Sequence, residues 1–206
     1  MTAKKINSTR GRPRAFDPEA AVETALALFH ERGYDAVGVA ELSQATGVKP
    51  PSLYAAFGSK QGLFERAVTL YRAREGAVVR EALAQEGPAD DVIPGLFIRA
   101  AEAYSADPRR PGCLILDGAR NSADTAVCDF MAELKAASRQ GILDRLRQDF
   151  PEADYPGAAG RLADFVGVVL AGLSAAARDG LPREALIETA TLAGTGFRAA
   201  CPQRAA

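Results

Sequence analysis

The stretch that most constrains the fold of this chain is residues 39–60, VAELSQATGVKPPSLYAAFGSK. Gly47 stands where a first short helix would end, because glycine adopts a positive φ without a Cβ clash. Pro50 and Pro51 then suit the first turn of a second helix, where their missing N–H groups leave no hydrogen bond unmade. Two short helices around a glycine turn are typical of a helix-turn-helix, whose second helix can enter a DNA major groove. The same spacing also fits a helical hairpin packed inside an ordinary bundle.

Residues 1–14 form a basic arm that favours the first interpretation. They carry five of the 25 Lys and Arg residues and no Asp or Glu, so the rest of the chain has 20 basic and 26 acidic side chains. Arg12 and Arg14 alternate with Gly11 and Pro13, which keeps the segment extended and narrow enough for a DNA minor groove. A basic arm on a near-neutral body is typical of a DNA-binding terminus, and the alternative is a solvated tail.

Composition predicts an all-α fold. Hydrophobic residues make up 48% of the 206, and no Val, Ile or Thr run alternates as a strand would. The three cysteines are far apart and odd in number, so we expect free thiols in a reducing cytoplasm, with no disulfide framework, metal or cofactor. The N-terminus lacks an apolar signal region and no apolar run reaches about 18 residues, so we expect no membrane span.

Capping signals predict a first helix from Asp17 to Gly33. His30, the one histidine, lies near its end and is expected at the surface or beside the helix dipole. After Ser59, apolar spacing predicts one long helix over residues 60–84, about 35 Å at 1.5 Å per residue, which links the head to a second domain. Further helical segments are expected over residues 90–106, 113–121, 124–150, 157–178 and 182–197.

About a third of the chain, its first 75 residues or so, resembles the DNA-binding head of the TetR family of bacterial transcriptional regulators. The residues that carry the resemblance are Ala25, Leu26, Leu28, Phe29, Gly33, Tyr34, Val39, Leu42, Gly47, Val48, Ser52, Leu53, Tyr54, Phe57, Lys60, Leu63 and Phe64. The resemblance implies a regulator, usually a repressor, that binds an inverted-repeat operator in double-stranded DNA as a homodimer and is released by a small-molecule effector. It divides the chain into a flexible arm (1–15), a helix-turn-helix domain (16–62) and a helical effector-binding and dimerisation domain (63–206).

The head supplies phosphate anchors but few base readers. Ser52 and Tyr54 carry hydroxyls on the second helix, and Lys60 adds a charge at the N-terminus of the next. Residues at these places contact the DNA backbone in the resembled family. Pro50 offers no hydrogen bond to a base edge, so Lys49, the arm and DNA shape would carry specificity. The predicted DNA contacts are Arg12, Arg14, Lys49, Pro50, Pro51, Ser52, Tyr54 and Lys60.

An effector pocket between helices would be apolar with a few polar groups. The candidate lining residues, each of which could instead be plain core, are Phe97, Tyr104, Cys113, Leu116, Asn121, Phe130, Met131, Leu134 and Phe165. Cys113 follows Arg109 and Arg110 and opens a predicted helix, two features that favour a reactive thiolate. Gly-Cys-Leu at this point also resembles a subgroup of the family with electrophile or oxidant sensors. The opposing interpretation is a buried small hydrophobe.

Small residues are concentrated in the last two helices: Gly167, Ala171, Gly172, Ser174, Ala175, Ala176, Ala190, Ala193, Gly194 and Gly196. They permit close helix approach, either in an intramolecular core or in the dimer interface that the resemblance implies. Asp117, Asp124 and Asp129 are expected as solvated faces or caps, and no nucleophile–base set or phosphate-binding loop is present, which argues against an enzyme. A purely structural helical oligomer would leave the basic arm unexplained.

Overall fold

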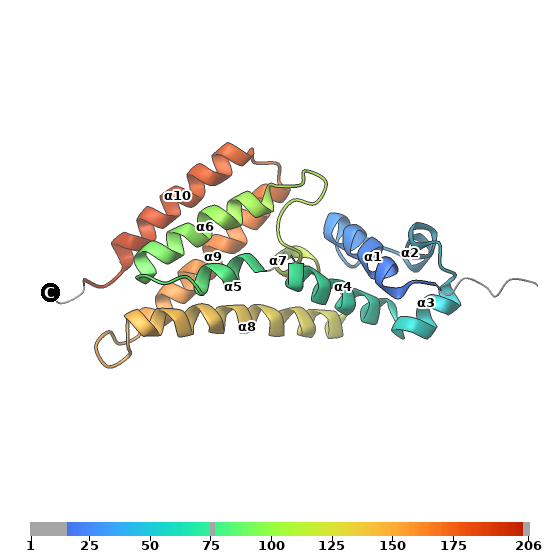
Figure 1. Ribbon diagram of the computed structural model, residues 1–206, viewed down its shortest axis with the longest axis horizontal. Coiled ribbons are helices and arrows are strands. Elements are labelled where there is room, and N and C mark those ends of the chain that lie inside the picture. Colours follow the sequence, from blue (N-terminus) through green and yellow to red (C-terminus); the bar gives the residue numbers. More distant parts are fainter. Residues whose placement is uncertain (1–15, 75–76, 204–206) are drawn as a thin grey trace, which may run out of the picture.

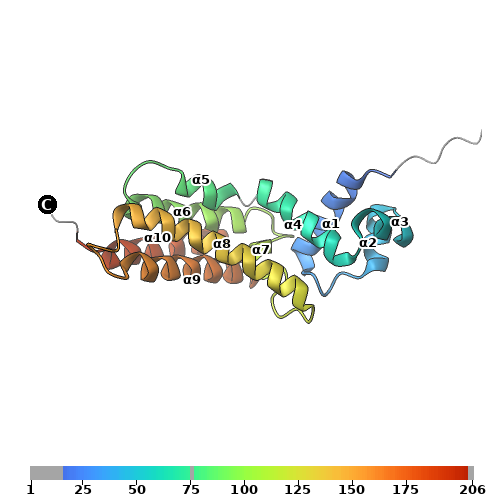
Figure 2. The same cartoon turned by 90° about the horizontal axis from the view of Figure 1, so that it is seen from below.

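The computed structural model describes residues 16–74 and 77–203, which form ten helices and no strand. Four helices and a connecting loop make a head at one end of an elongated molecule, and the other helices make a longer body (Figures 1 and 2). The predicted all-α architecture is confirmed. In chain order the helices are α1 (Pro18–Arg32), α2 (Val39–Thr46), α3 (Pro50–Phe57), α4 (Lys60–Arg74), α5 (Ala77–Leu83), α6 (Ala89–Tyr104), α7 (Leu114–Asp117), α8 (Thr125–Asp149), α9 (Ala158–Arg178) and α10 (Arg183–Ala200).

The head is organised around an aromatic cluster between α1 and α4. Asp17 caps α1, because its Oδ1 accepts from the backbone N–H of Glu19 at 2.9 Å. Phe29 of α1 stacks edge-on against Phe64 of α4, with ring centroids 5.1 Å apart. The ring of Tyr34 lies 5.0 Å from that of Phe64 and closes the cluster. Burial of these large rings fixes α1 against α4 and leaves α2 and α3 to project from the end of the molecule.

The stretch predicted as one long helix over residues 60–84 is described as two helical segments; residues 75 and 76 between them lie outside the described residues, so the continuity of the helix stays a prediction. α4 ends at Arg74 and α5 begins at Ala77. α4 packs against α1 in the head, whereas α5 packs against α6 and α8 in the body. The two apolar faces therefore follow different neighbours, and Figure 1 shows the two helices as separate segments along α8. Both halves have the same helical spacing in the sequence, so local patterns could not reveal that their packing partners differ.

Helices α6, α9 and α10 pack closely at the far end of the body. Pro94 lies inside α6 and meets Gly194 of α10, where an added Cβ would lie only 2.8 Å from the Pro94 Cβ. Gly194 is therefore a glycine of the intramolecular core. Gly167 and Gly172, on α9, face open space instead, with no described atom within 4 Å of an added Cβ. The small residues of the last two helices therefore include a core position at Gly194, and their role in a dimer interface stays a prediction.

α9 lies within the predicted range of residues 157–178, but it is more apolar over its length than the sequence analysis allowed. It spans 21 residues with a mean hydropathy of 1.4, so by length and composition alone it could cross a membrane. It instead contacts α6, α8 and α10, and 44% of its apolar window is buried in the structure. Core helices pass the same test, so this is weak evidence for a span.

Candidate DNA-binding surface and ligand cavity

The α2–turn–α3 unit presents one face of α3 to solvent. Gly47 ends α2 in the left-handed conformation (φ 69°), and Lys49 then forms the N-cap position of α3 with Pro50 at its first turn. Leu53 is buried in the head and fixes the helix, whereas Ser52 and Tyr54 lie exposed on either side of it. This periodicity leaves a polar, solvent-facing surface on a rigidly anchored short helix.

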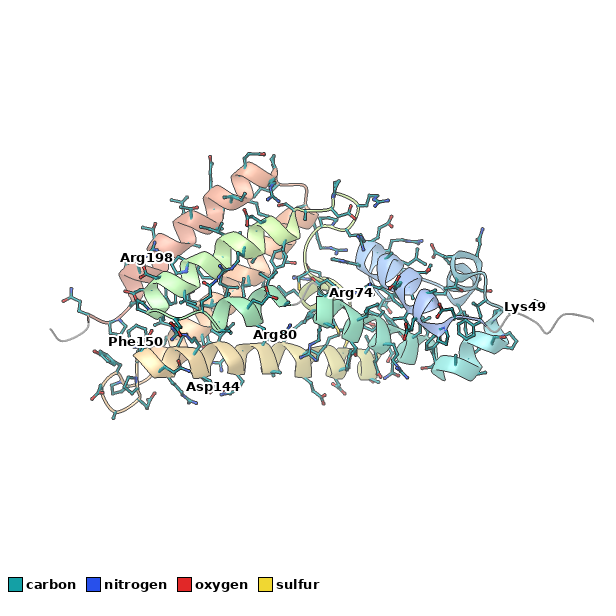
Figure 3. The ribbon with its side chains drawn as sticks, in the orientation of Figure 1. Lys49, Arg74, Arg80, Asp144, Phe150 and Arg198 are labelled. Atoms are coloured by element: carbon teal, nitrogen blue, oxygen red, sulfur yellow. The ribbon has the colours of Figure 1, made fainter. Side chains whose placement is uncertain are left out.

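Tyr54 is 47% exposed, so the core-aromatic interpretation of this residue does not describe the structure. Lys49 is exposed at the outer end of the head (Figure 3). Pro50 is half-buried and Pro51 exposed. Arg12 and Arg14 lie outside the described residues. The described members of the predicted DNA contacts therefore share one end of the molecule.

Lys60 begins α4 and is held more firmly than a free surface lysine. Its Nζ lies 4.0 Å from the centroid of the Tyr34 ring, a cation–π contact. Burial lowers the pKa of Lys60, while the carboxylates of Asp35 and Asp124 act in the opposite direction. The ammonium is thus positioned beside the N-terminus of α4, where a phosphate would also meet free backbone N–H groups.

The approach of α3 to α4 depends on a glycine that the sequence analysis overlooked. An added Cβ at Gly62 would lie 2.1 Å from the backbone oxygen of Phe57, the last residue of α3. The N–H of Gly62 donates to the Ser59 Oγ at 3.0 Å, which caps the helix as expected. The signal available in the sequence was a glycine in the first turn of a helix, where it weakens the helix and so points to a packing reason.

Tyr34 joins the head to the body. Its hydroxyl donates to Oδ2 of Asp124 at 2.8 Å, and its N–H donates to the Gly118 carbonyl at 2.7 Å. Burial and the bond to Asp124 raise the pKa of Tyr34 above its ordinary value, so the phenol is the stable form in this contact. Asp124 also caps α8, because its Oδ1 accepts from the N–H of Val127. The Asp124 carboxylate therefore fixes both the N-terminus of α8 and the side chain of Tyr34, whose ring lies beneath Lys60.

A second connection runs from α9 to the C-terminus of α1. The Arg178 guanidinium donates to the carbonyls of His30 at 3.2 Å, Pro111 at 3.3 Å and Glu31 at 3.5 Å. Carbonyls at a helix C-terminus carry partial negative charge, which makes a cation a favourable partner. The α9 helix is thereby tied to the first helix of the head through Arg178.

His30 is buried, which corrects the prediction of a surface position. Its Nε2 lies 3.2 Å from the Gly112 carbonyl, and its ring packs edge-on against Tyr71 with centroids 5.1 Å apart. The loop that covers it is 82 residues away in the chain, so no local pattern could reveal the burial. Gly112 adopts a φ of +81°, and its missing side chain leaves room for Arg178 and Ser174.

A cavity of about 1310 Å³ lies in the body between α4 and α5 on one side and α8 and α9 on the other. Tyr104, Cys113 and Leu116 line it, as the sequence predicted. Six other predicted residues are not among its lining residues: Phe97, Asn121, Phe130, Met131, Leu134 and Phe165. Phe97 and Met131 belong to the buried core, and Phe165 reaches the outer surface of α9 at 36% exposure. The apolar periodicity of the sequence predicts which side chains face inward. It does not predict whether those side chains fill the core or line a cavity.

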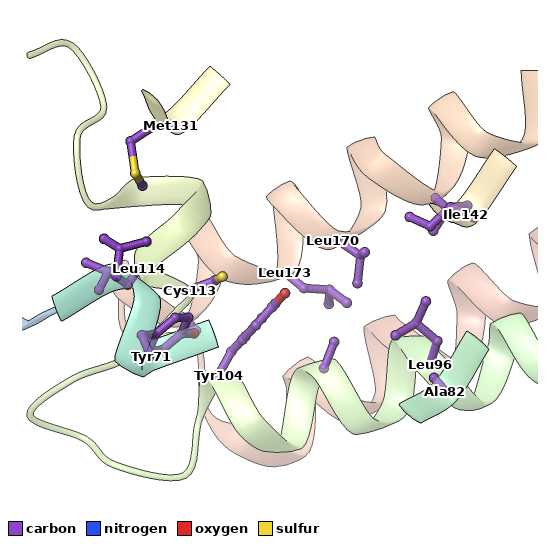
Figure 4. Close-up of a cluster of buried hydrophobic side chains, with 14 of the residues drawn as sticks. Tyr71, Ala82, Leu96, Tyr104, Cys113, Leu114, Met131, Ile142, Leu170 and Leu173 are labelled. Carbon is purple, nitrogen blue, oxygen red and sulfur yellow. The ribbon is translucent and has the colours of Figure 1, made fainter. Parts of the chain in front are cut away.

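The inner end of the cavity carries three polar side chains, Tyr71, Tyr104 and Cys113 (Figure 4). Both tyrosine hydroxyls interact with the Cys113 thiol, and Figure 4 shows the three side chains coming from separate elements. Burial raises the pKa of Cys113, although the bond from Tyr71 opposes this effect. Burial likewise raises the pKa of Tyr104.

Of the two interpretations of Cys113 that the sequence left open, the structure favours the buried thiol, since Cys113 is buried. Arg109 and Arg110 are occupied elsewhere, since the backbone N–H of Arg109 and the side chain of Arg110 lower the pKa of Asp107 to about 2. The helix that Cys113 opens, α7, has only four residues and a correspondingly small dipole.

Asp117 is a second correction, because it is buried and not a solvated residue. Its Oδ2 accepts from the Ser174 hydroxyl at 2.5 Å, and its Oδ1 pairs with Arg120 at 2.6 Å. Ser174 Oγ in turn accepts from the N–H of Cys113 at 2.7 Å. This network fixes the wall of the cavity against α9 and shows that Ser174 serves the core and not an outer interface. Among the described residues, no group of three or more His, Cys, Asp or Glu could hold a metal ion.

An exposed short helix anchored in a helix-turn-helix head, on a helical body with a large cavity, defines a helix-turn-helix DNA-binding regulator. The family described as "Bacterial regulatory proteins, tetR family" matches residues 21–67. The chain is 37% identical over 198 residues to the HTH-type transcriptional repressor BdcR of Escherichia coli strain K12, covering 96% of this chain and 98% of that one. It is 31% identical to the repressor ComR of the same strain, covering 94% and 93%.

Among solved structures, the fold is similar to a cysteine mutant of the TetR family transcriptional regulator CifR, which was complexed with 26-base-pair double-strand operator DNA. The TM-score is 0.81 at 34% identity, and the match covers 89% of this chain and 98% of that one. The chain belongs to the TetR family of bacterial transcriptional regulators, and it is not an enzyme.

Proposed function

We propose that this protein is a transcriptional repressor that acts in the cytoplasm, binds an inverted-repeat operator as a homodimer, and leaves it when a small molecule fills the body cavity. The observation that carries the proposal is the exposed outer face of α3, fixed by the buried Leu53 at one end of a molecule whose body holds a cavity of about 1310 Å³. The relatives BdcR and ComR are named as repressors. Residues 16–62 would form the DNA-binding domain, residues 63–206 the effector-binding and dimerisation domain, and residues 1–15 the arm.

The DNA contacts would divide between anchors and readers. Ser52 and Tyr54 offer hydroxyls on the exposed face of α3, and Lys60 offers a positioned ammonium beside the N-terminus of α4. Lys49, at the start of α3, is the described side chain with the reach and charge to contact a guanine edge or a phosphate. Arg12 and Arg14 would follow the minor groove.

Dimerisation through α9 and α10 would cover an apolar surface. Leu192 of α10 is 72% exposed, and Phe165 of α9, at 36% exposure, lies 4.0 Å from where a Gly196 Cβ would stand. Large apolar side chains beside glycines let two helices of one subunit meet two of another at short range. Two heads joined in this way would read two half-sites.

Release would follow from a change in the spacing of the two heads. Arg178 ties α9, a helix of the proposed dimer interface, to the end of α1, and Tyr34 ties the start of α8 to the head. The cavity reaches the first of these connections, since His30, whose carbonyl accepts from Arg178, lines it together with Tyr71 and Gly112. An effector that binds best to one spacing of the heads would lower operator affinity by its differential affinity for that spacing.

Selection of bound sequences from random DNA, followed by footprinting, tests the proposal. An inverted repeat protected by wild-type protein, and lost in a Leu192→Glu variant that sedimentation shows to be monomeric, is the expected result. A selected site without two-fold symmetry, or a monomeric variant that protects the same site equally well, would contradict it.

A further inference from the structure

We propose that the effector is an amphiphile with an apolar body and an anionic group, such as a carboxylate. This inference rests on the proposed function, since it names the class of ligand for the same cavity. It is carried by an uneven distribution of charge around the cavity, which the composition of the whole chain does not predict.

The interior of the cavity is apolar. Aliphatic side chains from four elements line it, namely Val78 and Leu83 of α5, Ile115 of α7, Ile142 of α8 and Leu170 of α9. Ile142 and Leu170 point into this region in Figure 4. The volume of about 1310 Å³ exceeds the range of about 300–1,000 Å³ that is usual for small-ligand sites. A ligand that filled it would bury a long or bulky apolar body.

The charged lining is basic in balance. Six of the described lining residues are cationic and three are anionic, on a chain whose net charge is −1. Three of the cations already have carboxylate partners: Arg110 with Asp107 at 2.9 Å, Arg139 with Asp164 at 2.7 Å, and Arg74 with Glu23 at 2.6 Å. In each pair the positive and the negative charge neutralise one another, so the pair adds no net charge that a ligand could meet.

The other three cations are Arg72, Arg80 and Lys135, and within the described part of the chain none has a carboxylate oxygen within 4.0 Å. They come from α4, α5 and α8, so they stand on both sides of the cavity; Figure 3 shows Arg80 on α5, above α8. Glu81 is the one lining carboxylate for which the described residues offer no such partner. Three cations against one anion would favour an anionic group on the ligand and disfavour a cationic one.

A panel of probes that share a chain and differ in head group tests the class. Binding of dodecanoate, dodecanol and dodecyltrimethylammonium, each below its micelle concentration, would be measured by calorimetry on the full chain. We expect dodecanoate to bind at least about threefold more tightly than dodecanol, as one exposed ion pair allows, and the cation to bind most weakly. Equal affinities, a preference for the cation, or no binding by any of the three would overturn the proposal.

Variants then assign the preference to the named side chains. In Arg80→Gln/Lys135→Gln, dodecanoate affinity should fall about tenfold while dodecanol affinity changes little. Arg147→Gln is the matched control, because Arg147 lies on α8 outside the cavity, and it should bind both probes as wild type does. A fall of equal size in the control would show a general charge effect and reject the assignment. Operator binding by ligand-free wild type, measured in parallel, separates a failure of the repressor proposal from a failure of the ligand class.

Discussion

Gly112 offers the sharpest test of how the head is joined to the body. Its φ of +81° lies in the left-handed region, and an added Cβ would stand 2.8 Å from the Arg178 Cγ and 2.9 Å from the Ser174 carbonyl oxygen. A non-glycine residue in that conformation costs about 1–2 kcal/mol, and an extra methyl group in a packed site costs about 1–3 kcal/mol more. The free energy of unfolding of Gly112→Ala should therefore fall by roughly 2–5 kcal/mol.

Gly180→Ala is the matched control. Gly180 has a similar φ of +87°, but no described atom lies within 4 Å of an added Cβ. The control should therefore lose only the conformational part, about 1–2 kcal/mol. At about 2–4 °C per kcal/mol for a chain of this size, thermal unfolding followed by circular dichroism should place the Tm of Gly112→Ala below that of the control by at least about 2 °C.

Equal Tm values for the two variants would refute the steric part of the argument. The site would then accommodate the methyl group, and Arg178 would not be held where the structure places it. If Arg178 does hold the end of α1, Gly112→Ala should also change operator affinity in a gel-shift titration, whereas Gly180→Ala should leave it close to wild type.

Three further predictions concern the head and the thiol. Lys60→Ala should weaken operator and nonspecific DNA binding alike and reduce the slope of log K against log salt by about 0.9 per half-site. Tyr54→Phe should weaken both kinds of binding without that change of slope. Unchanged gel-shift affinity in both variants would show that these residues do not contact DNA. Tyr34→Phe keeps the ring beneath Lys60 but loses the bond to Asp124, so urea unfolding at neutral pH should show a loss of about 1 kcal/mol. Because the pKa of Tyr34 is raised by folding, this stabilisation is fully present below the ordinary tyrosine pKa of about 10 and is lost as the pH rises through the higher folded value; a difference from wild type that persists in strong alkali would contradict the assignment. Burial raises the pKa of Cys113, so alkylation followed by mass spectrometry should modify the less buried Cys128 and Cys201 first, and an electrophile should release DNA equally from wild type and Cys113→Ser; release from wild type alone would restore the thiol-sensor alternative.

The head could be predicted from the sequence because its signals are local. A glycine at the end of α2, prolines at the start of α3 and a capping Asp17 each act within one turn of their own position, and all three lie where they were expected. The exposure of Tyr54 and the burial of Leu53 follow from the same short helix.

The junction between head and body could not be predicted, because its contacts join distant residues. His30 bonds to a loop 82 residues away, and Arg178 reaches carbonyls 147 and 148 residues away. The sequence left open whether Cys113 is a reactive thiolate or a buried thiol, and its burial involves Tyr71 and Tyr104, which come from other helices. The packing partners of α4 and α5 belong here too, since α4 packs against α1 and α5 packs against α6 and α8.

The short stretch around Gly47 by itself determined that two short helices meet at a glycine turn, since turn and cap preferences are properties of the local backbone. Only the tertiary structure decided where the body holds empty space and which charges surround it. Helical periodicity reports which face of a helix points inward, but not whether that face meets another side chain or a cavity. The basic balance around the cavity, and with it the proposed class of ligand, arises from cations on α4, α5 and α8 that the fold alone brings together.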